Sequence, residues 1–552
     1  MKSRELATLG RPGLAAGAFI AAMLTASLIA VFYLAWRAAG LPFIPFDVFD
    51  WMTRILPGQV LAAGIGVMVT VIRALSLGST AAAAKTAEQA MGIAGLFFTG
   101  TIAGAILFGI VRASRGRHAY SLGFGLGIVL GVPLALISHR VGQTASTGPL
   151  LSAAWIIGAF LLWGVILGSA DRRLLAVAGG STKPAVEADT GEAAERIDRR
   201  RFLVRLGGAT AVVTVIGAIV GELSDERRKA LGPELSRRML WSSTHPFPNA
   251  DAAVQPVPGT RPEFTPLERH YRIDINSIPT AIDPQQWRLK VGGLVEKPFA
   301  LTLEDLQRFD PMHQFITLSC ISNPVGGDLI GTTRWTGVSL QRLLPSLQLQ
   351  PDATHLEIRA ADGFYEVVSL ETIRSDERVM LTYAWDGVPL LPEHGYPLRI
   401  YIPDLYGMKQ PKWIESIEVT NHAKPGFWVI RGWDSAARMK ATSVIDTVAV
   451  DMTIINADHQ RLVPIGGIAH AGARGISKVE LQVDEGPWQE AALRKPLSEL
   501  TWVIWRYEWP FDPGKHTFTV RCYEGNGIPQ IAEPTPIEPS GATGLHSKSE
   551  MF

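Results

Sequence analysis

The chain has 552 residues, 47% of them hydrophobic, and a net charge of +1 from 52 basic and 51 acidic side chains. This balance implies no basic face and therefore no nucleic-acid partner. The two cysteines, Cys320 and Cys522, lie far apart, which excludes a disulfide framework or a multi-cysteine metal cage. Nearly all long apolar runs precede residue 222, so the length accommodates a membrane part followed by soluble domains.

Apolar stretches of membrane-spanning length occur at residues 13–36, 57–77, 91–111, 119–138 and 149–170. They predict a helical bundle over residues 1–175, with about five to six helices, in a bacterial cytoplasmic membrane. The bundle is either an anchor or a carrier of b-type haem. Haem would need paired histidines inside the spans, and the histidines before residue 240, His118 and His139, lie at span ends. No haem is therefore predicted.

Residues 176–222 are predicted to hold a cytoplasmic linker, a twin-arginine-like motif and a sixth apolar helix. The run Arg199-Arg200-Arg201-Phe202-Leu203, followed by an apolar stretch at 206–221, resembles a twin-arginine export signal in an internal position. The alternative is the positively charged flank of a sixth span. Both interpretations leave the rest of the chain outside the cytoplasm, so a multi-pass membrane protein with an extracytoplasmic catalytic domain is expected.

Residues 223–436 contain short strands with alternating apolar and polar residues, together with a helix, a pattern that indicates an α+β domain. A strand is expected at Trp287–Val291 and a helix at Thr302–Arg308, with Thr302 as its N-cap. The apolar run 315–318 predicts a buried strand that ends at Cys320, before a glycine-rich loop. A strand exit commonly presents a reactive side chain, and a single thiolate can bind a soft metal. The alternative is that Cys320 is a small buried hydrophobic residue.

The motif Cys320-x-x-Asn323, followed by Arg334-Trp335-x-Gly337-Val338, resembles the molybdenum-ligand loop of the sulfite oxidase family of molybdopterin enzymes. Residues 381–419, which contain YAWDGVPLL and HGYPLR, are similar to a second block of that family. The resemblance implies a sulfite-oxidase-type molybdopterin domain and a molybdenum–molybdopterin cofactor with Cys320 as the metal ligand. It also implies two-electron oxygen-atom transfer on a small-molecule substrate, with a separate electron-transfer partner.

The resemblance extends to individual site residues. The implied catalytic residues are Cys320, Tyr383 beside the substrate, and Arg506 from the last domain. The implied cofactor-binding residues are Asp274, Asn323, His394, Arg399, Gln410 and Lys412. Arginine and lysine suit the pterin phosphate, and arginine can contact it bidentately. Trp335 and Trp413 are expected to pack as pocket walls.

Two departures from the family pattern concern the substrate. Pro324 and Val325 follow Asn323 where sulfite-oxidising members carry arginines, and Arg272 lies one position away from another expected arginine. With fewer arginines, the positive electrostatic potential that would bind a dianion is weaker. Sulfite is therefore not favoured as the substrate. A reductase of sulfoxides or other oxidised sulfur or nitrogen compounds is the alternative enzyme. A degenerate, non-catalytic membrane sensor domain is the alternative outside enzymes.

Residues 437–552 carry short alternating strands separated by Gly and Pro turns, which predict an immunoglobulin-like β-sandwich. This domain resembles the family's dimerisation domain, so a homodimer through it is expected. Cys522 is predicted to be a packed core thiol. The tail from Glu538 is predicted to be disordered.

Overall fold

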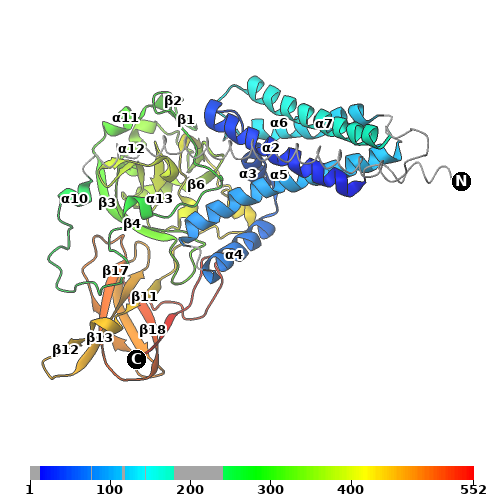
Figure 1. The fold of residues 1–552 in the computed structure, drawn as a ribbon. Coiled ribbons are helices and arrows are strands. Elements are labelled where there is room, and N and C mark those ends of the chain that lie inside the picture. Colours follow the sequence, from blue (N-terminus) through cyan, green and yellow to red (C-terminus); the bar gives the residue numbers. More distant parts are fainter. Residues whose placement is uncertain (1–12, 76–77, 115–117, 143, 180–239) are drawn as a thin grey trace. The chain divides into compact units, whose positions relative to one another are not determined.

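The computed structural model describes residues 13–75, 78–114, 118–142, 144–179 and 240–552 (Figure 1). The twin-arginine-like motif and the predicted sixth helix lie outside these residues. The described chain forms two compact units. A helical unit draws on residues 1–55, 85–236 and 276–278, and a strand-rich unit draws on residues 56–84, 237–275 and 279–552.

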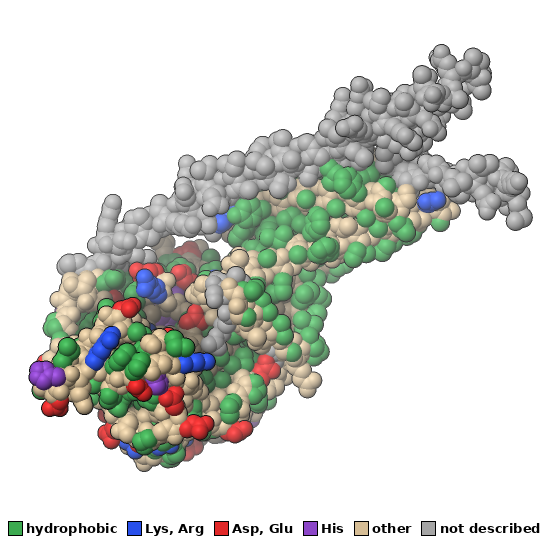
Figure 2. Space-filling model, turned by 60° about the horizontal axis from the view of Figure 1, so that its bottom comes forward, with side chains coloured by type: hydrophobic (Ala, Val, Ile, Leu, Met, Phe, Trp, Pro, Cys, Tyr) green, Lys and Arg blue, Asp and Glu red, His purple; other side chains and the backbone are tan. Residues whose placement is uncertain are grey.

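Four helices in the described part of the chain are long and apolar enough to cross a membrane: α2 (Leu14–Ala39), α5 (Thr80–Ala113), α6 (Ala119–Val141) and α7 (Pro149–Gly179). Their outward faces are apolar, and Figure 2 shows hydrophobic side chains over most of the visible helical surface. On α5, Phe98, Ile102 and Ile106 follow one another at four-residue spacing and are each more than half exposed. An exposed apolar stripe of this kind suits a lipid environment.

Helices α6 and α7 pack closely through facing glycines. A Cβ atom at Gly123 would lie 2.3 Å from the carbonyl oxygen of Gly164, and one at Gly168 would lie 2.5 Å from that of Ala119. Gly127 also faces α7, whereas Gly125 faces open space. Gly123 and Gly127 therefore permit the close approach of the two helices, whereas Gly125 takes no part in it.

The segment between the first two apolar stretches forms a helix that the hydropathy pattern did not indicate, α3 (Ile44–Ile55). Its two acidic residues are fully buried in the helical unit. Asp47 accepts hydrogen bonds from Ser138 (2.6 Å) and Thr144 (2.8 Å), and Asp50 accepts one from the backbone of Ser277 (2.8 Å). These partners offset the cost of burying both carboxylates, although one Asp50 oxygen has no hydrogen-bond donor among the described residues.

The apolar stretch at 57–77 forms α4 (Gly58–Ala74), which has 17 residues and is not among the four candidate spans. It belongs to the strand-rich unit, where it packs against η5 (Val429–Arg431). The chain then reaches Thr80, whose backbone N–H donates to the Asp328 carboxylate at 2.8 Å. An apolar helix that packs on protein and one that spans lipid have similar compositions, so hydropathy alone does not separate them.

The catalytic part of the strand-rich unit contains two five-stranded sheets. One has the order β2 (Phe299–Leu301), β1 (Leu289–Gly293), β10 (Ile414–Thr420), β5 (His355–Ala360) and β6 (Tyr365–Ser369). The other has the order β3 (Met312–Ser319), β4 (Ile330–Ser339), β7 (Met380–Trp385) and β8 (Val388–Pro389), with β9 (Arg399–Tyr401) also paired to β7. A shared core of aliphatic side chains joins them.

Short helices surround these sheets: α10 (Trp241–Thr244), η1 (Leu267–Arg269), α11 (Leu303–Gln307), α12 (Leu340–Leu343), η2 (Leu344–Leu347), α13 (Leu370–Ser375), η3 (Pro392–His394) and η4 (Gly407–Lys409). The predicted helix after Thr302 is α11, and its N-cap is confirmed. Thr302 accepts a hydrogen bond from the backbone of Asp305, whose carboxylate accepts one from the backbone of Thr302. This reciprocal pair is a capping box.

The C-terminal residues form two antiparallel sheets around one core. The first joins β11 (Thr442–Val448), β13 (Arg461–His470), β17 (Val503–Pro510) and β16 (Ala492–Leu493), with β12 (Ile454–Ile455) at its side. The second joins β15 (Gln489–Glu490), β14 (Ile476–Val483), β18 (Lys515–Glu524) and β19 (His546–Met551). η6 (Val450–Met452) follows β11. Side chains from both sheets fill the core, and the immunoglobulin-like topology stays a prediction.

Two expectations for this domain have clear outcomes. Cys522 is fully buried in β18, as predicted for a core thiol. The prediction of a disordered tail is wrong, because His546–Met551 pairs with β18 over six residues. Alternate side chains of this strand are exposed, which gave the sequence a polar, tail-like composition.

Candidate active site

The loop that leaves β3 is fixed by hydrogen bonds around Cys320. The Cys320 backbone N–H donates to the carbonyl of Leu329 at 2.9 Å, and the Asn323 N–H donates to the carbonyl of Cys320 at 3.1 Å. The Asn323 side-chain oxygen accepts a hydrogen bond from the Leu329 N–H at 2.9 Å. The Cys-x-x-Asn spacing therefore lets Asn323 bind both ends of the loop, Cys320 and Leu329, and these hydrogen bonds fix the position of the cysteine.

The Cys320 thiol is 8% exposed and lies 3.0 Å from the Ser322 hydroxyl. Leu329 and Ala81, which belongs to the same unit, pack beside it. Burial raises the pKa of this thiol. Without a metal ion the thiol is therefore protonated, whereas a bound metal ion would displace that proton.

A cluster of cations lies close to this loop. The Lys412 ammonium is 3.1 Å from the Asp274 carboxylate, and Arg272 binds the same carboxylate at 2.7 Å. The Asp274 side chain is 1% exposed. Burial lowers the pKa of Lys412, although Asp274 opposes that effect. An anion bound beside Lys412 would raise this pKa again and hold the positive charge in place.

Arg399 is a second buried cation. Its guanidinium donates to the carbonyl of His394 at 3.1 Å and stacks over the Trp335 ring at 4.9 Å. Within the described residues, Arg399 makes no ion pair with a carboxylate. Burial lowers the pKa of Arg399 to about 10. A buried guanidinium without an anion is costly, so this site is suited to a negatively charged ligand.

Imidazole and indole rings line the same region. The His394 ring lies 4.5 Å from Trp385 and 5.5 Å from His270, measured between centroids. Burial and the neighbouring His270 and cations keep the pKa of His394 well below its usual value. Among the described residues, the indole N–H groups of Trp335 and Trp385 are buried without an acceptor. Together with Arg399 and Lys412 they form a donor set that fits an anionic, oxygen-rich group such as a pterin phosphate.

Lys412 links the predicted site residues, because it pairs with Asp274, lies beside the Arg399–His394 pair and is near enough to lower the pKa of Cys320. Three other predicted residues have different surroundings. The Gln410 amide donates to the carbonyl of Leu405 at 2.8 Å. The Tyr383 ring packs in the core between the two sheets, and burial raises the pKa of its hydroxyl. Arg506, on β17, pairs with Glu508 at 3.0 Å.

Two further residues contribute to the site without having been singled out in the sequence. His270 contacts Trp335, Trp385 and His394, and burial lowers its pKa to about 3. Burial and the neighbouring Cys320 raise the pKa of Tyr271 well above its usual value. Both immediately precede Arg272. Two adjacent aromatic side chains were the available signal, but the linear sequence does not show which residues they contact.

Comparisons with known proteins agree with this geometry. A family model described as an oxidoreductase molybdopterin binding domain matches residues 275–428. The uncharacterized oxidoreductase YuiH of Bacillus subtilis is 31% identical over 156 residues, which are 28% of this chain and 76% of that protein. The sulfite oxidase of Arabidopsis thaliana is 26% identical over 274 residues, covering 41% of this chain and 70% of that protein.

A third relative is a putative protein-methionine-sulfoxide reductase subunit, YedZ1, of Azospira oryzae. It is 29% identical over 153 residues, which are 28% of this chain and 56% of that protein. The chain thus spans little more than half of this relative's length.

Proposed function

Because the chain belongs to the family of oxidoreductases with a molybdopterin-binding domain, we propose that Cys320 binds molybdenum and that Arg399 and Lys412 hold the phosphate of the pterin. The observation that carries this proposal is the group of buried cations near a buried thiol, with Asp274 as their paired carboxylate. When bound, the cofactor supplies two-electron oxygen-atom transfer, which no side chain performs.

The chain's own residues would bind the cofactor, orient it and shield it from water. Cys320 loses its proton on binding the metal, because a thiolate rather than a thiol is the ligand. Asn323 holds the loop so that the sulfur keeps a fixed position. The burial of Arg399 and His394 keeps water away from the pterin and strengthens each contact to it.

The substrate side is proposed to begin at a small polar cavity next to the Cys320 loop, whose volume of about 20 Å³ admits one water-sized group rather than a whole substrate. Ser319, Asn323, Tyr406, Lys440 and His470 are among the residues that line it. Burial lowers the pKa of His470 to about 3, so this ring is neutral near pH 7. Lys440 is then the only positively charged residue in the cavity lining. A weakly charged substrate is favoured over a dianion.

Two directions of catalysis fit this site: oxidation of a small substrate with oxygen from water, and reduction of a sulfoxide or another oxidised sulfur or nitrogen compound. The test is to purify the full chain, measure molybdenum and pterin, and assay a substrate panel with artificial electron acceptors and donors. We expect one molybdenum per chain and turnover in one direction. Protein that folds in a cell able to make the cofactor, yet contains no molybdenum, would instead support the sensor alternative.

We further propose that the strand-rich unit lies outside the cytoplasm and that Arg199 and Arg200 direct its export. A domain that receives a large pterin in the cytoplasm must fold before it crosses, which the twin-arginine route permits. Replacing Arg199 and Arg200 by Lys should leave this unit inaccessible to protease in spheroplasts. Lys substitutions at Arg172 and Arg173 provide a control that should export normally. A cofactor-loaded, accessible unit in the first variant would rule out the export signal.

A further inference from the structure

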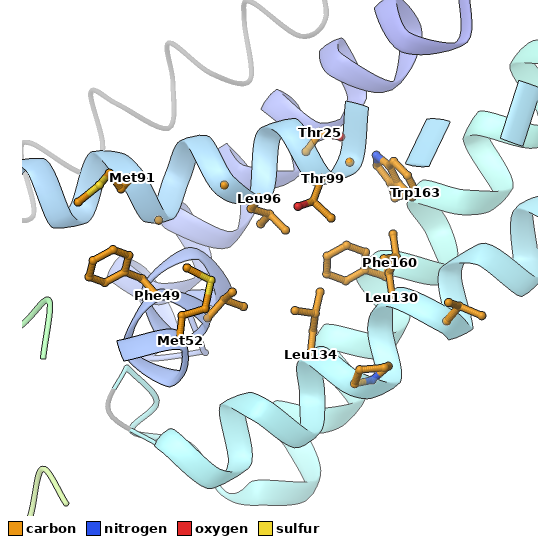
Figure 3. A pocket seen from close by; sticks show the side chains of 16 residues that line it. Thr25, Phe49, Met52, Met91, Leu96, Thr99, Leu130, Leu134, Phe160 and Trp163 are labelled. Atoms are coloured by element: carbon orange, nitrogen blue, oxygen red, sulfur yellow. The ribbon is translucent and has the colours of Figure 1, made fainter. Parts of the chain in front are cut away.

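The helical unit encloses a cavity of about 230 Å³, the bundle cavity, which the proposed function does not use. It is lined by side chains from α2, α3, α5, α6 and α7 (Figure 3). For comparison, an apolar cavity of about 150 Å³ is enough to bind benzene. The bundle cavity is therefore large enough for a substituted ring.

The bundle cavity has a polar end, where Thr25 and Trp163 are buried and Thr99 is exposed, and an apolar end, where Met52 and Met91 are exposed. Figure 3 shows Thr25, Thr99 and Trp163 gathered on one side, and Phe49, Met52 and Met91 on the other. Thr25 and Trp163 are 1% and 3% exposed, whereas Met52 and Met91 are 40% and 50% exposed. An amphiphile could enter with its polar head first and leave its apolar tail at the lipid-facing surface.

Two polar atoms at the polar end lack partners within the described residues: the Thr25 hydroxyl and the Trp163 indole N–H. Leaving such groups unpaired inside a protein is costly. Both can donate a hydrogen bond, so they fit a ligand with carbonyl acceptors. A lipid acyl chain would fill the same space and leave both groups unpaired.

We propose that the bundle cavity binds the headgroup of a membrane quinone. The aromatic ring of Phe160 also lines the cavity, 6.4 Å from that of Trp163 between centroids, and can stack with a flat ring (Figure 3). The quinone carbonyls accept hydrogen bonds from Thr25 and Trp163, and its isoprenoid tail leaves beside Met52 and Met91. The site thus takes a benzoquinone or a naphthoquinone with an apolar tail.

The role of this ligand rests on the proposed function. In the oxidising direction, each turnover moves an oxygen atom from water into the substrate and releases two electrons and two protons. The quinone takes up both, and its two carbonyls become hydroxyls. In the reducing direction, a quinol supplies the two electrons and two protons, and the oxygen atom leaves the substrate as water. The quinone is the separate electron partner that the catalytic part requires.

The test measures binding to the full-length protein in lipid nanodiscs, using decyl-substituted benzoquinone and naphthoquinone as probes. Thr25→Val and Trp163→Phe keep the cavity apolar but remove one donor each. Each should weaken binding of the preferred quinone about three- to tenfold, and the double variant should weaken it more than tenfold. Thr101→Val is the matched control, because the Thr101 hydroxyl donates to the carbonyl of Phe97 at 2.8 Å and does not line the cavity.

Two results would overturn the proposal. One is unchanged quinone binding in the double variant, and the other is equal competition by decylbenzene, which has the same tail but no carbonyls. The second result would identify a generic apolar cavity. These assays do not depend on molybdenum, and turnover with artificial electron carriers should stay normal in the variants. Failure of the quinone site and failure of the proposed function are therefore distinguishable.

Discussion

Replacing Cys320 by Ser is expected to abolish most turnover while the protein keeps its fold and its pterin. A hydroxyl is a harder and far less acidic ligand than a thiol, so it binds molybdenum poorly. Changes to residues that only orient metal ligands already cost about 10- to 100-fold, so loss of the ligand should cost at least about 100-fold. The proposed pterin contacts through Arg399 and Lys412 would be left in place.

The chain provides a matched control for this experiment in its other cysteine. Cys522 is fully buried, and its sulfur lies 3.3 Å from the Gln530 side-chain oxygen. Both Cys320→Ser and Cys522→Ser should lower the free energy of unfolding by about 1–3 kcal/mol, because each replaces a buried thiol by a more polar hydroxyl. Molybdenum, pterin, activity and the thermal unfolding midpoint should be measured for both variants. Full activity in Cys320→Ser would reject the metal assignment.

Replacing Arg399 by Met is expected to affect cofactor loading and stability in opposite directions. Loss of a hydrogen bond to a charged group costs about 1.5–3 kcal/mol, which corresponds to about 10- to 150-fold weaker binding of the pterin phosphate. The cofactor-free protein should be as stable as the wild type or more so, because a buried cation without a carboxylate partner is replaced by an apolar side chain of similar length.

The measurement is the pterin content at equilibrium, together with the melting temperature of protein made without the cofactor. Arg378→Met is the control, because Arg378 pairs with Asp376 at 2.8 Å and its side chain is 34% exposed. This variant should load the cofactor normally. If Arg399→Met lowered the melting temperature of cofactor-free protein as much as it lowered loading, Arg399 would have a structural role rather than a phosphate-binding one.

The features that could be predicted from sequence are those that depend on neighbouring residues. The strand before Cys320, the N-cap at Thr302 and the apolar runs of α2, α5, α6 and α7 all follow from local patterns. The core position of Cys522 follows from its place in an alternating strand. The resemblance to the family then predicted that His394, Arg399 and Lys412 share one site with Cys320, although they lie far from it in the sequence.

Features that depend on distant contacts were not predictable. His270 acquires its role only when β4, β7 and η3 bring Trp335, Trp385 and His394 around it. The final strand, β19, has too few apolar side chains to be recognised, because its stability comes from backbone pairing with β18. In the same way, α4 has a composition that hydropathy assigns to lipid, whereas its partner is a short helix more than 350 residues later in the chain.

The position of residues 56–84 in the strand-rich unit makes the two units interlaced along the polypeptide. Thr80 binds Asp328, and Ala81 packs beside Cys320, yet both residues are synthesised before most of the helical unit. A truncated chain that begins at Leu240 would therefore lack part of the catalytic body and not only its anchor. The strand-rich unit can be completed only after its C-terminal strands have been synthesised, and any exporting machinery must handle a domain whose first piece lies upstream of three candidate membrane-spanning helices.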